Sequence, residues 1–229
     1  MRLLSSALLS VAMLAGAIGA TQAQTAPGAA IYAVTYFDLV PADFNKAVGL
    51  LRAFAQATRK EDGNVEFTLL DEIGRSGRMA MIEAWRDKSA LEAHRAATQK
   101  LANKLQPFMA APFDTREFLP LSIGERANDA KLSTAMYALT HIDVFPDGKD
   151  TATALVKAFA ESSRKAKGAE RFDALVWDGH PNHFHLIEAW TDPFARDAHS
   201  YSDQTKTFRA KLVPLEGALY DERLYRVVK

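Results

Sequence analysis

The sequence predicts an α+β protein made of two tandem repeats, each with the element order β-α-β-β-α-β. Residues 31–99 align without a gap to residues 136–204 at a constant offset of 105. Roughly a third of the aligned positions are identical, which indicates an internal duplication. Within each repeat, β-rich runs and apolar residues at helical spacing alternate with glycine and proline turn signals.

The elements of the first repeat follow from local signals. Pro41 ends the first β-rich run and opens a helix, which Gly63 terminates. A glycine-rich hairpin turn at residues 74–77 separates two further strands, and Pro107 ends the second helix. The predicted elements are a strand at 31–39, a helix at 44–59, strands at 65–73 and 78–85, a helix from about 87 to 105, and a short strand at 113–119.

This order is that of a ferredoxin-like unit, in which a four-stranded antiparallel sheet carries both helices on one face. The other face needs a cover, and the second repeat supplies a partner sheet within the same chain. We therefore expect the two antiparallel sheets to pack as an intrachain pseudo-dimeric α+β barrel. The expected boundaries are repeat one at residues 30–120, a polar linker at 121–134 and repeat two at 135–229.

The N-terminus predicts export. Residues 1–23 have the pattern of a cleavable signal peptide, with Arg2 before an apolar run and cleavage after Ala20 or Ala23. An uncleaved membrane anchor is the less favoured alternative, because the apolar run is of marginal length and ends in small residues. We expect a periplasmic or secreted bacterial protein with no membrane contact after cleavage.

The amino-acid composition limits the kinds of binding partner that we expect for this protein. The chain has 28 Lys and Arg residues, 28 Asp and Glu residues and no cysteine. A balanced charge provides no field that attracts nucleic acid, so none is expected as a partner. A chain without cysteine has neither disulfides nor thiolate metal sites, and packing alone must stabilise an exported fold.

The third strand of each repeat separates two kinds of side chain. We expect the small aliphatic face, represented by Ala80, Ile82 and Ala84, to pack under the helices. The opposite face is then expected to line a ligand cavity between the sheets. The alternative places its Glu and Trp at the barrel mouth, in contact with water. The residues of this second face are Met79, Met81, Glu83 and Trp85 in repeat one, and Phe184, Leu186, Glu188 and Trp190 in repeat two.

A histidine follows in the second helix of each repeat. His94 lies nine residues after Trp85, and His199 repeats it. One interpretation makes it a proton relay at the cavity edge. The other makes it a contact that fixes the second helix to the sheet, and its recurrence does not separate the two.

These residues resemble the signature of the antibiotic biosynthesis monooxygenase (ABM) family, which includes quinol monooxygenases of small dimeric α+β barrels. The signature is a strand ending Glu-x-Trp, a short acidic turn, and Ala/Leu-x-x-His on the following helix. It covers both repeats and is more specific for the family than for a substrate. It is matched by Glu83, Trp85, Ala90, Leu91 and His94, and by Glu188, Trp190, Ala195 and His199.

The resemblance implies oxidation of a small quinol, phenol or anthrone by O₂ without a cofactor. In that chemistry the protein binds and deprotonates the substrate, whose anion then reduces O₂. By resemblance, Trp85 and Trp190 orient the substrate and His94 and His199 relay the proton. Glu83 and Glu188 act as the base or orient that histidine. We add Tyr36 and His141, on the first strands, as substrate-binding residues.

The chain departs from its relatives at two places. Many carry a Pro-His pair on the second helix, where this chain has Thr98-Gln99 and Asp203-Gln204, which puts proton transfer in doubt. Relatives that degrade haem carry an asparagine on the first strand; this chain has none there, so haem degradation is disfavoured.

Repeat two contains five of the six histidines. His183 and His185 share a strand face, but no carboxylate near them in sequence is placed as a third ligand, so no metal is predicted. His141 together with His199 favours repeat two as the working copy. The alternative function is a non-catalytic protein that binds an apolar or haem-like ligand between the sheets. A structural or stress-response role with vestigial sites, and a homodimer, also stay open.

Overall fold

The computed structural model describes residues 31–125 and 127–229. The predicted signal peptide, residues 1–23, lies outside these ranges. Within them, no helix is both long and apolar enough to cross a membrane.

Each repeat has the predicted order β-α-β-β-α-β, and the second repeat divides its second helix. Ser202 begins a new helix there, because its Oγ accepts a hydrogen bond from the Thr205 amide at 3.2 Å. The elements of repeat one are β1 (Ile31–Leu39), α1 (Phe44–Thr58), β2 (Asn64–Glu72), β3 (Arg78–Trp85), α2 (Lys88–Leu105) and β4 (Met109–Ser122). After α3 (Asp129–Leu132), those of repeat two are β5 (Met136–Asp143), α4 (Lys149–Ser163), β6 (Ala169–Trp177), β7 (His180–Trp190), α5 (Pro193–Ser200), α6 (Asp203–Leu212) and β8 (Asp221–Val227).

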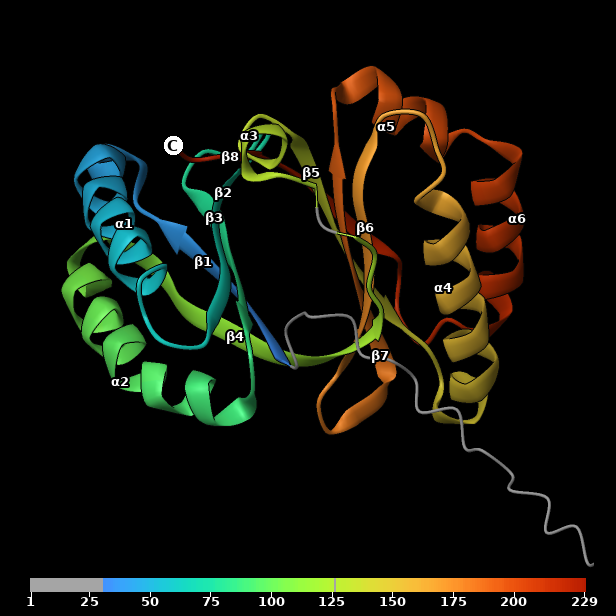
Figure 1. Cartoon of the computed structure of the whole chain (residues 1–229), viewed down its shortest axis with the longest axis horizontal. Coiled ribbons are helices and arrows are strands. Elements are labelled where there is room, and N and C mark those ends of the chain that lie inside the picture. The colour runs from blue at the N-terminus through green and yellow to red at the C-terminus, as the bar shows by residue number, and fades with distance from the viewer. Residues whose placement is uncertain (1–30, 126) are drawn as a thin grey trace, which may run out of the picture.

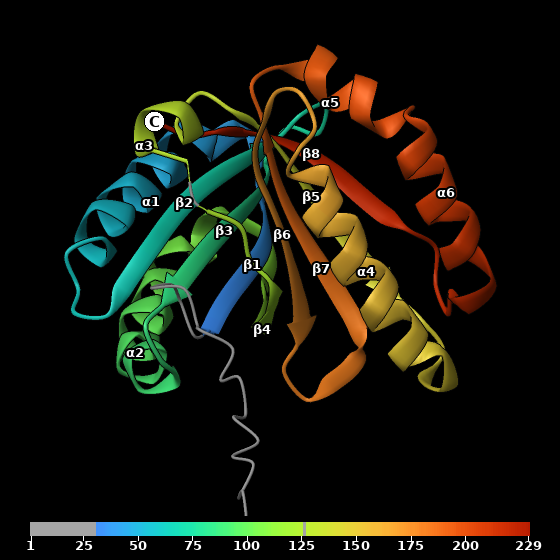
Figure 2. The same ribbon diagram turned by 45° about the vertical axis from the view of Figure 1, so that its right-hand side comes forward.

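The two sheets join at both edges into one closed barrel. The strand order is β1-β3-β2-β8-β5-β7-β6-β4, and all pairings are antiparallel. The pairs β2–β8 and β4–β6 link one repeat to the other, so the last strand of each repeat pairs with its neighbour's second strand. The four long helices cover the outside, α1 and α2 over repeat one and α4 and α6 over repeat two (Figures 1 and 2). The predicted pseudo-dimeric α+β barrel is confirmed.

The barrel interior shows that the predicted orientation of β3 and β7 is wrong. Ala80, Ile82 and Ala84 belong to the inner core, which draws on all eight strands. Met79 and Met81 instead pack beneath α1 and α2. The reason is geometric: side chains just fill the inside of an eight-stranded barrel, so the small residues of β3 leave room there for aromatic residues from other strands. The inner core also holds Tyr32, Val34, Leu70, Phe118, Tyr137, Leu139, Leu175, Ile187, Ala189 and Tyr225.

A buried ion pair joins the repeats at equivalent positions. Glu66 and Arg171 are separated by the repeat offset of 105, and Arg171 Nη1 donates to both Glu66 carboxylate oxygens at 2.8 and 3.0 Å. Arg171 Nε also donates to Asp173 Oδ2 at 2.6 Å. In a homodimer of single repeats, this position would place identical residues in both subunits. Fusion into one chain allows opposite charges there.

Candidate active site at the barrel mouth

The Glu-Trp-His group of repeat one is buried beneath α2. Trp85 Nε1 donates to Glu83 Oε2 at 3.1 Å, and His94 Nε2 lies 3.4 Å from the same oxygen. His94 Nδ1 is 2.7 Å from Oε2 of Glu61, just after α1. Burial raises the pKa of Glu83, while His94 and the Trp85 hydrogen bond counteract the shift. These contacts tie α1, α2 and β3 together.

The corresponding group of repeat two has different partners. Trp190 Nε1 donates to Glu188 Oε2 at 2.9 Å, but His199 Nε2 contacts Ser163 Oγ at 2.9 Å. Burial raises the pKa of Glu188 to about 7, opposed by its hydrogen bond from Trp190. Burial also lowers the pKa of His199 to about 4, with Arg196 adding to the shift. The carboxyl and the imidazole both favour their neutral forms here.

The two groups therefore lie neither between the sheets nor in water at the barrel mouth. Trp85 and Trp190 are completely buried, and Glu83, Glu188, His94 and His199 are at most 7% exposed. They occupy the outer face of the barrel, the face that the helices cover, so both expected locations are wrong. The histidines do contact sheet and helix, as the structural interpretation requires. The predicted catalytic roles remain predictions.

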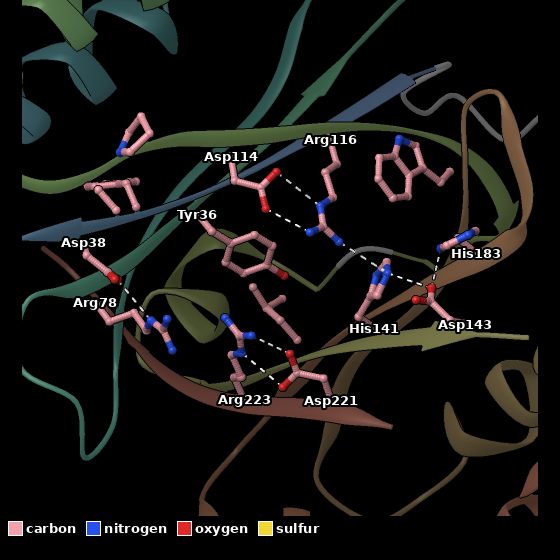
Figure 3. Close-up of a pocket in the computed structure, with 15 residues that line it drawn as sticks. Tyr36, Asp38, Arg78, Asp114, Arg116, His141, Asp143, His183, Asp221 and Arg223 are labelled. Atoms are coloured by element: carbon pink, nitrogen blue, oxygen red, sulfur yellow. Dashed lines mark hydrogen bonds and ion pairs between the residues drawn. The ribbon is translucent and has the colours of Figure 1, made fainter. Parts of the chain in front are cut away.

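A pocket of about 450 Å³ opens at the barrel mouth. It has the size of a small-molecule site. Of the predicted site residues it brings together Tyr36 from β1 and His141 from β5, and none of the other six lines it (Figure 3). The remaining lining residues are Phe37, Asp38, Arg78, Ala111, Pro112, Asp114, Arg116, Leu139, Asp143, Trp177, His183, Asp221 and Arg223.

The pocket inherits pairs of positions from the duplication. Tyr36 is equivalent to His141, Asp38 to Asp143, and Arg78 to His183, all at the offset of 105. Beyond the two-residue insertion, Asp114 and Arg116 are equivalent to Asp221 and Arg223. The aspartate and arginine at the 107 offset and the aspartate at positions 38 and 143 are thus kept in both repeats, while Tyr36 and Arg78 are replaced by histidines in repeat two.

Arg116 and Arg223, two of the three arginines that line the pocket, each carry a fixed positive charge beside an aspartate. Arg116 Nη2 donates to Asp114 Oδ2 at 2.9 Å, and Arg223 Nε donates to Asp221 Oδ1 at 3.1 Å. The Arg116 guanidinium lies 4.9 Å from the centre of the Trp177 ring. Each guanidinium is partly exposed and has further donor groups, so it can also bind an anionic oxygen.

Tyr36 and His185 form a neutral pair beside the pocket. Tyr36 Oη lies 3.4 Å from Nε2 of the fully buried His185. Burial raises the pKa of Tyr36 well above its usual value and lowers the pKa of His185 well below its own. His185 Nδ1 is buried without a hydrogen-bond partner among the described residues. Both groups stay uncharged near neutral pH.

Sequence reasoning missed Arg116, Arg223, Trp177 and Asp143. A signal existed for the arginines, because the alignment at the offset of 107 pairs Asp114 and Arg116 with identical residues. Asp143 lies 40 residues before His183 in the chain, and only the pairing of β5 with β7 places them opposite each other. No local pattern marked Trp177, which ends β6 beside the hairpin.

Comparisons of the sequence and of the structure relate this chain to the same group of proteins. The family profile described as antibiotic biosynthesis monooxygenase matches residues 30–102 and 135–211. The candidate monooxygenase YcnE of Bacillus subtilis (strain 168) is 26% identical over 81 residues, which cover 34% of this chain and 85% of YcnE. The structure of a candidate monooxygenase from Fusobacterium nucleatum superposes with a TM-score of 0.78 at 15% identity, covering 88% of this chain and 94% of the other. An anthrone oxidase-like protein gives a TM-score of 0.68 at 12% identity, with coverage of 87% and 91%.

Proposed function

Because the chain belongs to the antibiotic biosynthesis monooxygenase family, we propose that it oxidises a small aromatic hydroxy compound with O₂ in the pocket at the barrel mouth. The substrate class is a quinol, phenol or anthrone, and the reaction follows the cofactor-independent chemistry that the sequence resemblance implies. The anthrone oxidase-like protein that shares the fold makes anthrones a reasonable part of a substrate panel.

One observation supports this location: hydrogen-bond donors for an oxyanion line the pocket together with an aromatic side chain. Arg116 and Arg223 contribute guanidinium groups, and the high pKa of Tyr36 keeps its hydroxyl protonated as a further donor. Trp177 also lines the pocket, with the Arg116 guanidinium over its ring. Donors already placed around a developing phenolate or enolate stabilise it without reorganisation.

The proposed chemistry needs no external reductant. For an anthrone, the substrate loses a proton, and the anion held by the two arginines gives its electrons to O₂. The CH₂ group becomes a carbonyl, one oxygen atom enters the product and the other leaves as water. The protein's part is to orient the ring and to stabilise the anion.

The non-catalytic alternative receives less support from the same geometry. The space between the sheets is filled by the inner core, including Phe118, Tyr137 and Tyr225, all completely buried. The mouth pocket is lined by charged groups, which suit an aromatic ligand that carries an oxygen anion better than a purely apolar one.

The buried Glu-Trp-His group of repeat two is a second candidate location for the reaction. Glu188, with a pKa of about 7, is matched to proton transfer near neutral pH, and Trp190 fixes its orientation. This site would require α5 or α6 to move, because Trp190 is completely buried.

Oxygen uptake tests the proposal and separates the locations. The wild-type protein is mixed with hydroquinones, phenols and anthrones, with products identified by mass spectrometry. Arg116→Gln and Arg223→Gln should each lower the rate about 100-fold, the typical cost of losing one oxyanion donor. Trp190→Phe and His199→Ala should leave it within a few-fold, by the same reasoning.

No uptake above buffer across the panel would contradict the function. Loss of activity only in the Trp190 and His199 variants would move the site beneath the helices. Export is a separate proposal that rests on residues 1–23. Cell fractionation followed by N-terminal sequencing tests it, and a chain that stays in the cytoplasmic fraction and still begins at Met1 would contradict it.

A further inference from the structure

Three side chains at the edge of the mouth pocket converge on one point. His141 and Asp143 lie on β5 and His183 on β7, and one nitrogen or oxygen atom from each lies within 4.8 Å of the others (Figure 3). Asp143 and His183 are direct partners across the two antiparallel strands, and His141 is two residues away on the same face. The backbone ladder therefore holds the three residues on a rigid surface.

Two imidazole nitrogens of this triad converge on one carboxylate oxygen. His141 Nε2 lies 2.9 Å from Asp143 Oδ1, and His183 Nδ1 is in close contact with the same oxygen. Yet Asp143 Oδ1 and His183 Nδ1 are buried atoms without an acceptable hydrogen bond within the described ranges. Arg116 Nη1 also approaches His141 Nε2, at 3.3 Å, so this nitrogen faces a donor as well as the carboxylate.

Repeat one shows what occupies the equivalent place. Its three positions hold Tyr36, Asp38 and Arg78, and Arg78 Nε donates to Asp38 Oδ1 at 3.0 Å. There the chain supplies its own cation to the repeated aspartate. In repeat two the aspartate is kept, while the arginine and tyrosine positions both hold imidazoles. Repeat two therefore has no arginine at this place and has instead two imidazoles that can bind a metal ion.

From this geometry we infer that His141, Asp143 and His183 bind a divalent transition-metal ion of the Zn²⁺ or Fe²⁺ type. Two imidazoles and one carboxylate are borderline N and O ligands that suit these ions, and three protein ligands leave positions open for water or a ligand. Bonds of about 2 Å in tetrahedral geometry separate ligand atoms by about 3.3 Å, so small side-chain rotations suffice. The side chains are 19% to 24% exposed, which keeps the open positions accessible from the pocket.

The surrounding charges are compatible with such an ion. Arg116 is the opposing cation: its bidentate pairing with Asp114 partly offsets its charge, and its Nη1 must leave the 3.3 Å contact with His141 Nε2 when that nitrogen binds an ion. Asp221 on β8 is the register partner of His141 on β5 and adds a second carboxylate to the environment. The inference concerns ion binding only and does not depend on the proposed oxidation.

Titration calorimetry with Zn²⁺ and absorption spectroscopy with Co²⁺ test the inference, on EDTA-treated protein without a histidine tag. The wild type should bind one equivalent of either ion, with ligand-field bands for Co²⁺. His183→Arg, which installs the residue of repeat one, and Asp143→Asn should each weaken binding by more than the roughly 10–100-fold cost of losing an outer-shell partner. His180→Gln, at the exposed start of β7 in the same hairpin, should leave the affinity unchanged.

Thermal unfolding in EDTA shows whether each variant is folded, and the Asp143 variant serves if the His183 variant is not. The inference is overturned if the wild type binds neither ion at about 100 µM, or if both triad variants bind like the wild type. Loss of binding in His180→Gln to the same extent as in His183→Arg would also overturn it, since the ligands would then be those of the hairpin. A protein that binds the ion but consumes no oxygen keeps this inference and loses the proposed function.

Discussion

The two Glu-Trp-His groups keep one hydrogen bond and exchange another. In both repeats the tryptophan indole donates to the glutamate two residues before it. In repeat one His94 bridges Glu83 and Glu61, so an imidazole lies between two carboxylates. In repeat two Ala166 stands at the Glu61 position, and His199 contacts the Ser163 hydroxyl instead.

One substitution thus changes the electrostatics of an otherwise repeated group. Without a second carboxylate, the histidine and glutamate of repeat two behave as separate buried groups, each with its charged form disfavoured. Duplicated sequence therefore does not imply the same charged partners around the repeated residues. The same is true in the pocket, where an arginine pairs with the aspartate in repeat one and histidines lie beside the equivalent aspartate in repeat two.

The largest expected effect concerns the buried Glu66–Arg171 ion pair, which joins the two repeats. Arg171→Met leaves Glu66 buried and unpaired, and should lower the free energy of unfolding by about 3–5 kcal/mol. The double variant Glu66→Met/Arg171→Met should recover a substantial part of that loss, because no isolated carboxylate then remains at position 66. Urea unfolding of wild type, both single variants and the double variant completes the cycle. Strict additivity would show that the pair is not coupled.

The dependence of stability on pH should reveal the separate groups of repeat two. A pKa of about 7 for Glu188 in the folded state, against 4.5 unfolded, gives stability that is complete below pH 4.5 and lost as the pH rises through 7. That loss is on the order of 3 kcal/mol. Glu188→Gln should therefore gain stability over the wild type between pH 4.5 and 8, as measured by urea unfolding. Glu83→Gln is the matched control and should show a smaller change with pH, because His94 offsets its desolvation.

His199 should act in the opposite direction. Its folded pKa of about 4, against 6.5, gives stability that is present above pH 6.5 and lost as the pH falls through 4. Between pH 4.5 and 6.5 the effects of Glu188 and His199 on the free energy of unfolding therefore oppose each other in the wild type. In Glu188→Gln only the effect of His199 remains, so the stability of this variant should rise with pH over that range. Equal pH profiles for Glu188→Gln and Glu83→Gln would contradict the contrast between the repeats.

The smallest predicted effect comes from giving one repeat the other's residue. Glu61→Ala should cost about 1–2 kcal/mol, because His94 Nδ1 loses its partner in a buried site. The reciprocal Ala166→Glu places a longer polar side chain where Ala166 is partly buried against the core of repeat two, and should cost about 0.5–1 kcal/mol. Urea unfolding at pH 7 measures both. An unchanged Glu61→Ala variant would show that the bridge in repeat one is not stabilising.

The fold was largely predictable, and the site was predictable only in part. The duplication and the turn signals at Pro41 and Gly74 led to the correct element order, because these are local properties of the chain. The linker prediction missed α3, which lies at residues 129–132. Tyr36 and His141 meet in the pocket, but Glu83 and Trp85 lie on the other face of the barrel wall from it.

The sequence by itself determined two similar α+β units, the absence of disulfides and the repeated groups of chemical residues. Only the tertiary structure decided which face of each strand is inside. Strand alternation shows that Glu83 and Ala84 point in opposite directions, but both faces of these strands are buried, so alternation alone does not identify the inner one. Barrel closure decides it, since the pairs β2–β8 and β4–β6 leave only a narrow interior. The same closure brings together Arg116, His141 and Arg223, which are far apart in the sequence, in one pocket.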